Sequence, residues 1–180
     1  MCSRNGSNNA QITAIPDLDM SSAENCQSMF SQTKLARFPL KNTSRVTTFR
    51  QAFMGCLFTE AELDLTSCTD MRSTFNNCTL LETLTLINTQ NVKSTNWEAC
   101  FTKCSGLKFF SVDMLNIVDN KLDFSACTNL TVESLVNILN ALSDNTSLST
   151  TYTVKIGSTN LAKLSAEQKA IAINKNIELT

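Results

Sequence analysis

Apolar residues recur along this chain in short pairs separated by a single residue. Measured on the second member, the first four steps between successive pairs are 20, 25, 21 and 26 residues. A period of two predicts short β-strands that bury one face. The predicted strands are Leu18-Asp19-Met20, Phe38-Pro39-Leu40, Leu63-Asp64-Leu65, Leu84-Thr85-Leu86, Phe110-Ser111-Val112 and Leu122-Asp123-Phe124, followed after a longer gap by Val154-Lys155-Ile156 and Ile177-Glu178-Leu179.

A second pattern, F-x-x-C, lies between the strands. Its copies are Phe53 to Cys56, Phe75 to Cys78 and Phe101 to Cys104. Each copy is preceded by apolar residues at intervals of three or four positions. That spacing is typical of one face of a short helix. Those residues are Val46 and Phe49, Met71, and Trp97. Each unit is therefore predicted as strand, turn, a helix of two or three turns, turn and strand. Stacked units of this kind share one continuous core.

The C-terminal part has a different pattern. Thr131 is a candidate cap for a helix that ends near Leu142, and 143–151 is a polar loop. A strand is expected around Thr153 to Ile156. A second helix is expected after it, with a capping box at Ser165 to Gln168. The sequence thus divides into a polar N-terminal arm (1–14), repeats (15–130) and C-terminal capping repeats (131–180).

Most of the eight cysteines fall at equivalent positions of the repeat. Cys56, Cys78 and Cys104 would stack as a ladder about 4.8 Å apart. A disulfide is compatible with that spacing, and so is a zinc site that uses Cys100 and Cys104. We expect free, buried thiols that reach turn carbonyls, because a regular ladder gives no preferred pairing. Cys68 and Cys127 are each expected just after a strand.

Charge and composition exclude several classes of function. The net charge is −1, from 15 basic and 16 acidic residues. No basic face for nucleic acid is therefore expected. No apolar run is long enough to span a membrane. Met1 to Gln11 has no apolar segment of the kind found in signal peptides, although Cys2 as a lipid-bearing first residue is an alternative.

The chain has no histidine, which removes the Ser-His and Cys-His nucleophile arrangements and the most frequent metal ligand. Phosphate-binding glycine motifs are also missing. We therefore expect a protein that is not an enzyme and holds no cofactor or metal. Asp64 and Asp123 occupy equivalent strand positions. We expect both carboxylates to lie on a solvated strand face; a paired acid–base site is the alternative. Trp97 is either a core residue or a binding anchor.

The expected binding surface is the concave face of the sheet, because stacked-repeat proteins commonly bind on such extended faces. Ile87 and Phe109 would be exposed apolar groups there, forming either a contact patch or ordinary surface. The candidate partner-binding residues are Arg37, Lys41, Asp64, Thr85, Ile87, Phe109, Ser111, Asp113, Lys121 and Asp123.

Three motifs together resemble the leucine-rich repeats of the BspA-like family of bacterial surface proteins. They are F-x-x-C, L-x-x-L-x-L as in Leu81, Leu84 and Leu86, and Asn-Thr followed by Val, as in Asn88-Thr89 to Val92. The resemblance covers roughly 15–130 and implies an α/β leucine-rich-repeat solenoid. That fold is a short horseshoe with a parallel sheet on the concave face, short helices on the convex face and a C-terminal helix–strand capping unit.

The segment from Leu130 to Ala172 is similar to the C-terminal ends of such repeat proteins from gut bacteria and their phages. The resemblance implies a protein of the bacterial cell surface that adheres to a protein or glycan, or a virion component such as a tail or fibre. A purely architectural subunit of a larger assembly is the alternative.

Overall fold

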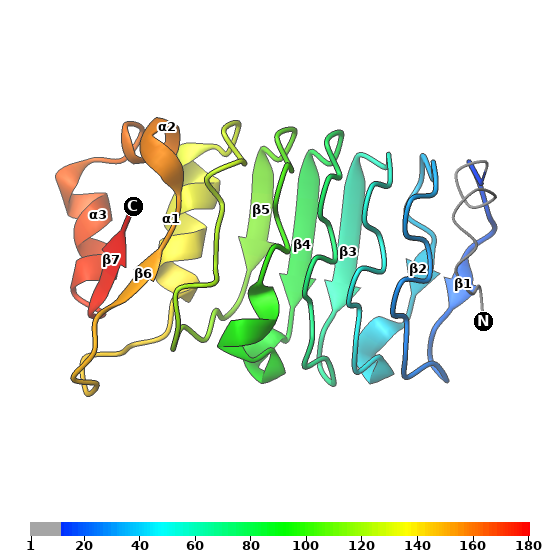
Figure 1. The fold of residues 1–180 in the computed structure, drawn as a ribbon, viewed down its shortest axis with the longest axis horizontal. Coiled ribbons are helices and arrows are strands. Elements are labelled where there is room, and N and C mark those ends of the chain that lie inside the picture. Colours follow the sequence, from blue (N-terminus) through cyan, green and yellow to red (C-terminus); the bar gives the residue numbers. More distant parts are fainter. Residues whose placement is uncertain (1–11) are drawn as a thin grey trace.

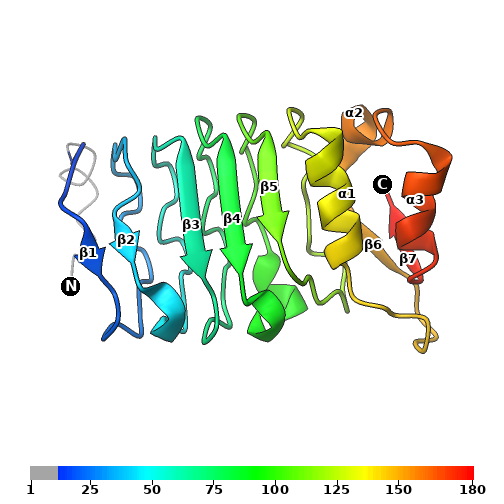
Figure 2. The same ribbon diagram turned by 180° about the vertical axis from the view of Figure 1, so that it is seen from behind.

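The computed structural model describes residues 12–180, so most of the predicted N-terminal arm lies outside it. Those residues form a mixed α/β fold with three small parallel sheets and three α-helices. Successive passes of the chain lie side by side along one axis, and the α-helices gather at the C-terminal end (Figures 1 and 2). The sheets in this part of the chain do not close into a barrel.

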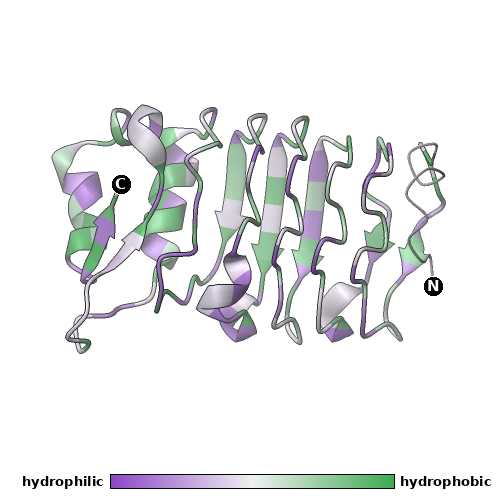
Figure 3. Ribbon diagram, viewed as in Figure 1, coloured by the Kyte–Doolittle hydropathy of each residue, from purple (hydrophilic) through white to green (hydrophobic). Residues whose placement is uncertain are grey.

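The strands occur close to most of the predicted positions. β1 (Leu18–Asp19) pairs with β2 (Leu40–Lys41), and β6 (Tyr152–Val154) pairs with β7 (Ile177–Leu179). The central sheet has the order β3 (Glu60–Asp64), β4 (Thr83–Ile87), β5 (Phe109–Val112). Buried and exposed residues alternate along these strands. Figure 3 shows the matching alternation of hydrophobic and hydrophilic residues along β3. The predicted alternation is therefore confirmed for the central sheet.

The segments predicted as helices within the units are instead pairs of consecutive β-turns. In one unit, Ala52 N–H donates to the Phe49 carbonyl (2.8 Å) and Cys56 N–H donates to the Phe53 carbonyl (3.0 Å). The third residue of each turn has a positive φ, as in type II turns: 57° at Gln51 and 76° at Gly55. The same pairs of turns occur at 26–29 and 30–33, at 71–74 and 75–78, and at 97–100 and 101–104.

Hydrogen bonds between units explain why turns replace helices. The N–H groups of Phe49, Gln51, Phe53 and Gly55 donate to the carbonyls of residues 70, 72, 74 and 76 in the next unit. Those donors cannot also form the i→i−4 bonds of a helix. Consecutive four-residue turns place apolar residues four positions apart, which is close to the 3.6-residue period of a helix. The sequence pattern alone therefore could not distinguish a helix from two consecutive turns. We call this side of the molecule the turn row.

A second prediction, the strand at Leu122-Asp123-Phe124, is met only by an isolated parallel bridge between Asp123 and Lys155. Phe124 begins a turn that Cys127 N–H closes on the Phe124 carbonyl (2.8 Å), so this segment is a further F-x-x-C turn in the turn row. The place beside β5 is taken by α1 (Val132–Ala141). Ser134 Oγ accepts a hydrogen bond from Phe110 N–H (2.9 Å), and Asn137 Oδ1 accepts one from Val112 N–H (3.0 Å). Two helix side chains thus satisfy the sheet edge.

The core lies between the central sheet and the turn row. Phe53 stacks on Phe30 and Phe75, with ring centroids 6.0 and 5.8 Å apart, and Phe101 stacks on Phe124 at 4.6 Å. Trp97 is buried and stacks on Phe101, as the core interpretation expects. Within residues 12–180, three short 3-10 helices lie at the ends of the passes, at Thr43–Arg45, Thr89–Asn91 and Ser94–Trp97.

The C-terminal helices follow from local signals. Thr131 accepts a hydrogen bond from Ser134 N–H and caps α1, and Ser165 with Gln168 forms the predicted capping box of α3 (Ala166–Ile173). The short α2 (Gly157–Leu161) was not predicted from the sequence.

Lys175 joins α1 to the C-terminal segment. Its ammonium group donates to the carbonyls of residues 139, 140 and 142, at 3.1, 2.6 and 2.7 Å. These are orphan carbonyls at the end of α1, where a cation is also favoured by the helix dipole. We expect Lys175→Met to lower the free energy of unfolding by about 1–3 kcal/mol in urea titrations. Lys155→Met, which removes an exposed lysine, is the control; equal losses in both variants would contradict this role.

Candidate functional site

The exposed side of the central sheet carries aligned polar side chains. The strand register places Glu62 opposite Thr85 and Thr85 opposite Ser111, one row across β3, β4 and β5. Thr83 lies opposite Phe109 in the adjacent row. Neighbouring strands are about 4.8 Å apart, so each row presents side chains at that interval. The predicted residues Thr85, Ile87, Phe109 and Ser111 lie on this side.

A hollow of about 580 Å³ lies over the junction between β2 and β3, where the two sheets are not paired. Arg37 and Lys41 line one side of it, and Glu60 and Glu62 line the other. The guanidinium of Arg37 also forms an ion pair with Asp17. The hollow therefore has a basic wall and an acidic wall, and it extends over β4 as far as Thr85 and Ile87.

A smaller hollow of about 200 Å³ lies between β5 and α1. Its lining includes Phe109 and Ser111 from β5 and Glu133 and Asn137 from α1. Thr83 and Thr85 line both hollows, so the two meet over β4. We refer to the pair of hollows, from Arg37 and Lys41 to Glu133 and Asn137, as the trough.

Two of the predicted binding residues hold neighbouring units together. Asp64 Oδ1 accepts hydrogen bonds from Thr66 N–H (3.0 Å) and from Asn88 Nδ2 (3.0 Å) of the next unit. Asp113 accepts bonds from the N–H groups of Asn88 (2.6 Å) and Thr89 (3.0 Å). Partial burial alone would raise the pKa of the Asp64 carboxyl, but the bonds from Thr66 and Asn88 outweigh it and lower the pKa. Both carboxylates are thus already engaged within the fold.

The structure separates Lys121 and Asp123 from the other predicted site residues, and their assignment to the sheet face is wrong. Lys121 Nζ pairs with Glu98 Oε1 (3.1 Å), a residue of the turn row. Asp123 Oδ1 accepts bonds from the N–H (2.8 Å) and hydroxyl (2.6 Å) of Ser125. The error arose because Leu122-Asp123-Phe124 alternates like a strand of the central sheet, whereas Asp123 forms a bridge with Lys155 and Phe124 begins a turn. Asp64 and Asp123 consequently lie across the core from each other and do not form an acid–base pair.

The cysteines are structural. Cys56, Cys78 and Cys104 direct Sγ at the Phe30, Phe53 and Phe75 carbonyls of the preceding unit, at 3.3, 3.1 and 3.0 Å. The seven cysteines within 12–180 are free and buried, as predicted for the ladder. Desolvation raises the pKa of their thiols, to about 11 at Cys56 and about 12 at Cys127. Cys2 lies outside the described residues.

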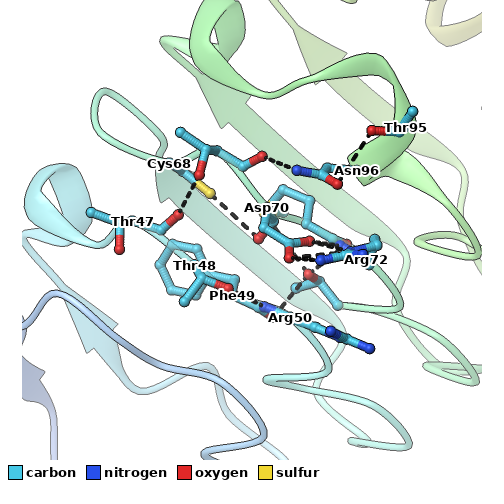
Figure 4. A network of polar contacts seen from close by, with 12 residues as sticks. Thr47, Thr48, Phe49, Arg50, Cys68, Asp70, Arg72, Thr95 and Asn96 are labelled. Carbon is cyan, nitrogen blue, oxygen red and sulfur yellow. Dashed lines mark hydrogen bonds and ion pairs between the residues drawn. The ribbon is translucent and has the colours of Figure 1, made fainter.

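A network of polar contacts in the turn row also has a structural role (Figure 4). Arg72 Nε donates to both Asp70 carboxylate oxygens, at 3.0 and 3.1 Å. The Asp70 carbonyl accepts from Phe49 N–H (3.0 Å) and from Cys68 Sγ (3.7 Å). This cluster therefore links two units of the turn row and uses its charges internally.

Glu133 and Asn137 were not predicted as site residues from the sequence. The helix around them was predicted, but its position beside β5 could not be, because a strand was expected there. No group of three or more metal-ligating side chains occurs within residues 12–180. Across the same stretch, none of the helices has the length and apolar character needed to cross a membrane. No protein-family model, curated protein or solved structure matches this chain.

Proposed function

We propose that this chain is a leucine-rich-repeat solenoid that acts as a non-catalytic interaction module and binds a protein or glycan partner along the trough. The observation that carries the proposal is the contrast between the two sides of the core. In the turn row, thiols bond to the preceding unit, as at Cys78, and the Asp70 carboxylate pairs with Arg72 of its own unit. Glu62, Thr85 and Ser111 line the trough without a side-chain hydrogen bond to any residue of 12–180.

Adhesion at a bacterial cell surface, or attachment as part of a virion, is the setting that we propose for this binding. Stacked repeats form extended binding surfaces, and such a surface suits a long polypeptide or glycan partner. The ion pairs and hydrogen bonds of the turn row would then maintain the spacing of the strands that form the trough.

A purely architectural role is the second candidate, and a different surface favours it. An apolar hollow of about 450 Å³ lies at the C-terminal end of the stack, lined by Leu161, Ile173, Ile177 and Leu179. The Ile173 side chain is 65% exposed. Contacts at this end would join the chain to other subunits of an assembly and leave the trough unused.

A matched pair of charge variants tests the trough. Thr85→Arg places a cation in the trough. The control, Gln27→Arg, places the same side chain in the turn row. Other units already have an arginine at the equivalent turn position, namely Arg50 and Arg72. We expect Thr85→Arg to lose at least 10-fold in affinity for immobilised gastric mucin, a probe that presents both polypeptide and glycans. Gln27→Arg should bind like the unchanged protein.

Biolayer interferometry gives these affinities, and urea titration checks that both variants remain folded. Equal affinity in the two variants, or no binding of mucin by the unchanged protein, would contradict the proposed function.

A further inference from the structure

We propose that the hollow between β5 and α1 is a subsite for one neutral sugar residue of a glycan, which stacks on the Phe109 ring. This inference rests on the proposed function and names the class of ligand. The hollow measures about 200 Å³. At about 30 Å³ per water molecule it holds roughly six or seven waters, which is about the space of one pyranose ring.

Phe109 supplies the stacking surface. Its side chain is 52% exposed at the start of β5, the outer strand of the central sheet, while its neighbour Phe110 is 3% exposed and packs in the core. An exposed apolar group of this size marks a contact surface when polar groups surround it. A flat phenyl face matches the C–H face of a pyranose, and burying it removes apolar area from water.

Polar groups around the ring can bind sugar hydroxyls. The Asn137 amide is fixed because its Oδ1 accepts from Val112 N–H (3.0 Å), which leaves the NH₂ group as a donor. The hydroxyls of Thr85 and Ser111 both donate and accept, and the Glu133 carboxylate accepts. In residues 12–180 these last three side chains have no internal hydrogen-bond partner, and all line the hollow. The hollow thus combines one apolar face with a mixed set of donors and acceptors.

The charge of the lining favours a neutral ligand. No lysine or arginine lines this hollow, and its one ionised group is Glu133. Sialylated, sulfated or phosphorylated ligands carry negative charge and would meet a carboxylate without a compensating cation. The basic residues Arg37 and Lys41 lie at the far end of the trough, beyond β3.

A peptide strand is less well suited to this hollow. Peptides that extend a sheet need an open strand edge. The backbone of β4 is paired on both sides, and the outer edge of β5 is occupied by Ser134 and Asn137. Recognition here must come from side chains, which suits the ring and hydroxyls of a sugar.

Two variants and a matched control test the subsite. Phe109→Ala removes the stacking ring, and Asn137→Asp keeps the acceptor for Val112 N–H but removes the amide donor. Val118→Ala removes an apolar side chain of similar exposure, 55%, that lies outside both hollows. A printed array of neutral and sialylated oligosaccharides identifies a binder, and isothermal titration calorimetry gives its affinity for each variant.

We expect binding to neutral oligosaccharides, at least a 10-fold loss in Phe109→Ala, a smaller loss in Asn137→Asp and no change in Val118→Ala. Preference for sialylated glycans, or full affinity in Phe109→Ala, would overturn the subsite.

Deglycosylated mucin separates the two proposals. Loss of binding on deglycosylation supports the glycan subsite. If the unchanged protein still binds deglycosylated mucin and Thr85→Arg abolishes that binding, the glycan subsite is rejected and the trough remains as a protein-binding surface. Binding of native mucin that Thr85→Arg does not reduce would reject both proposals.

Discussion

Raising the pH above 9 is expected to unfold this protein, although its stability should hardly change between pH 5 and 8. Burial raises the pKa of the native thiols, to about 11 at Cys26 and about 12 at Cys68. In the unfolded chain a cysteine ionises near pH 8.5. The unfolded state therefore binds fewer protons than the native state above that pH, and the free energy of unfolding falls as pH rises.

The size of the effect comes from the number of buried thiols. A well-buried thiol contributes a slope of up to about 1.4 kcal/mol per pH unit between its unfolded and native pKa values. Seven cysteines within 12–180 are buried. Together they would reduce a typical free energy of unfolding of about 5–15 kcal/mol to zero within roughly two pH units. The chain has no histidine, so the neutral range should be flat.

Urea titrations from pH 5 to 10.5 measure this dependence. Cys127→Ala removes one of these thiols. In this variant the free energy of unfolding should fall less steeply above pH 9, by the contribution of one thiol. A constant free energy of unfolding between pH 8 and 10 would contradict the account, as would rapid reaction of the native thiols with Ellman's reagent at pH 8.

On the acid side the carboxylates set the limit. Hydrogen bonds outweigh burial and lower the pKa of three carboxyls: Asp64 through Thr66 and Asn88, Asp113 through Thr89 and Asn88 of the preceding unit, and Asp70 through Arg72. Their stabilising effect is present above about pH 4 and is lost as pH falls through the lowered native values. The same titrations, extended to pH 2, should show a second and gentler decline there.

Phe53→Ala is the single substitution from which we expect the largest loss of stability at neutral pH. The Phe53 ring is fully buried and contacts five other phenylalanines, at centroid distances of 5.1–6.2 Å. Truncation removes buried apolar surface and leaves a cavity among rings fixed by two neighbouring units. We expect a loss of about 3–5 kcal/mol in the free energy of unfolding.

Phe109→Ala is the matched control, because it removes the same ring from an exposed position. The loss in free energy of unfolding for Phe109→Ala should stay below about 1 kcal/mol. Together the two variants separate a phenylalanine that holds units together from one that faces solvent. Similar losses at the two positions would mean that the exposed side of the sheet is packed against something else, contrary to the proposed trough.

Much of the fold was predictable from the apolar pattern. The period of two located β1, β3, β4 and β5, and the cap signals located α1 and α3. The F-x-x-C pattern correctly indicated inward-facing cysteines. The turns themselves were not predicted, because the spacing of Phe49 and Phe53 suits both a helix and two consecutive turns. Only the hydrogen bonds from one unit to the next decide between them.

The candidate site was less predictable because it depends on which segment follows β5 in space. The alternation at Leu122-Asp123-Phe124 indicated a sixth strand, which would have placed Lys121 and Asp123 on the sheet face. The structure places α1 there instead, which brings Glu133 and Asn137 to Phe109. Asp64 and Asp113 were predicted on the concave sheet face, but their bonds to Asn88 and Thr89 depend on how neighbouring units are placed, which a sequence pattern does not carry.

Hydroxyl-radical footprinting of the protein with and without gastric mucin tests the central claim, that the sheet side binds a partner, most directly. Phe109 and Ile87 are exposed on that side, and Val118 and Ile173 are exposed outside the trough. We predict that mucin protects Phe109 and Ile87 from oxidation and leaves Val118 and Ile173 unchanged. Protection of Val118 or Ile173 with Phe109 still fully reactive would contradict it.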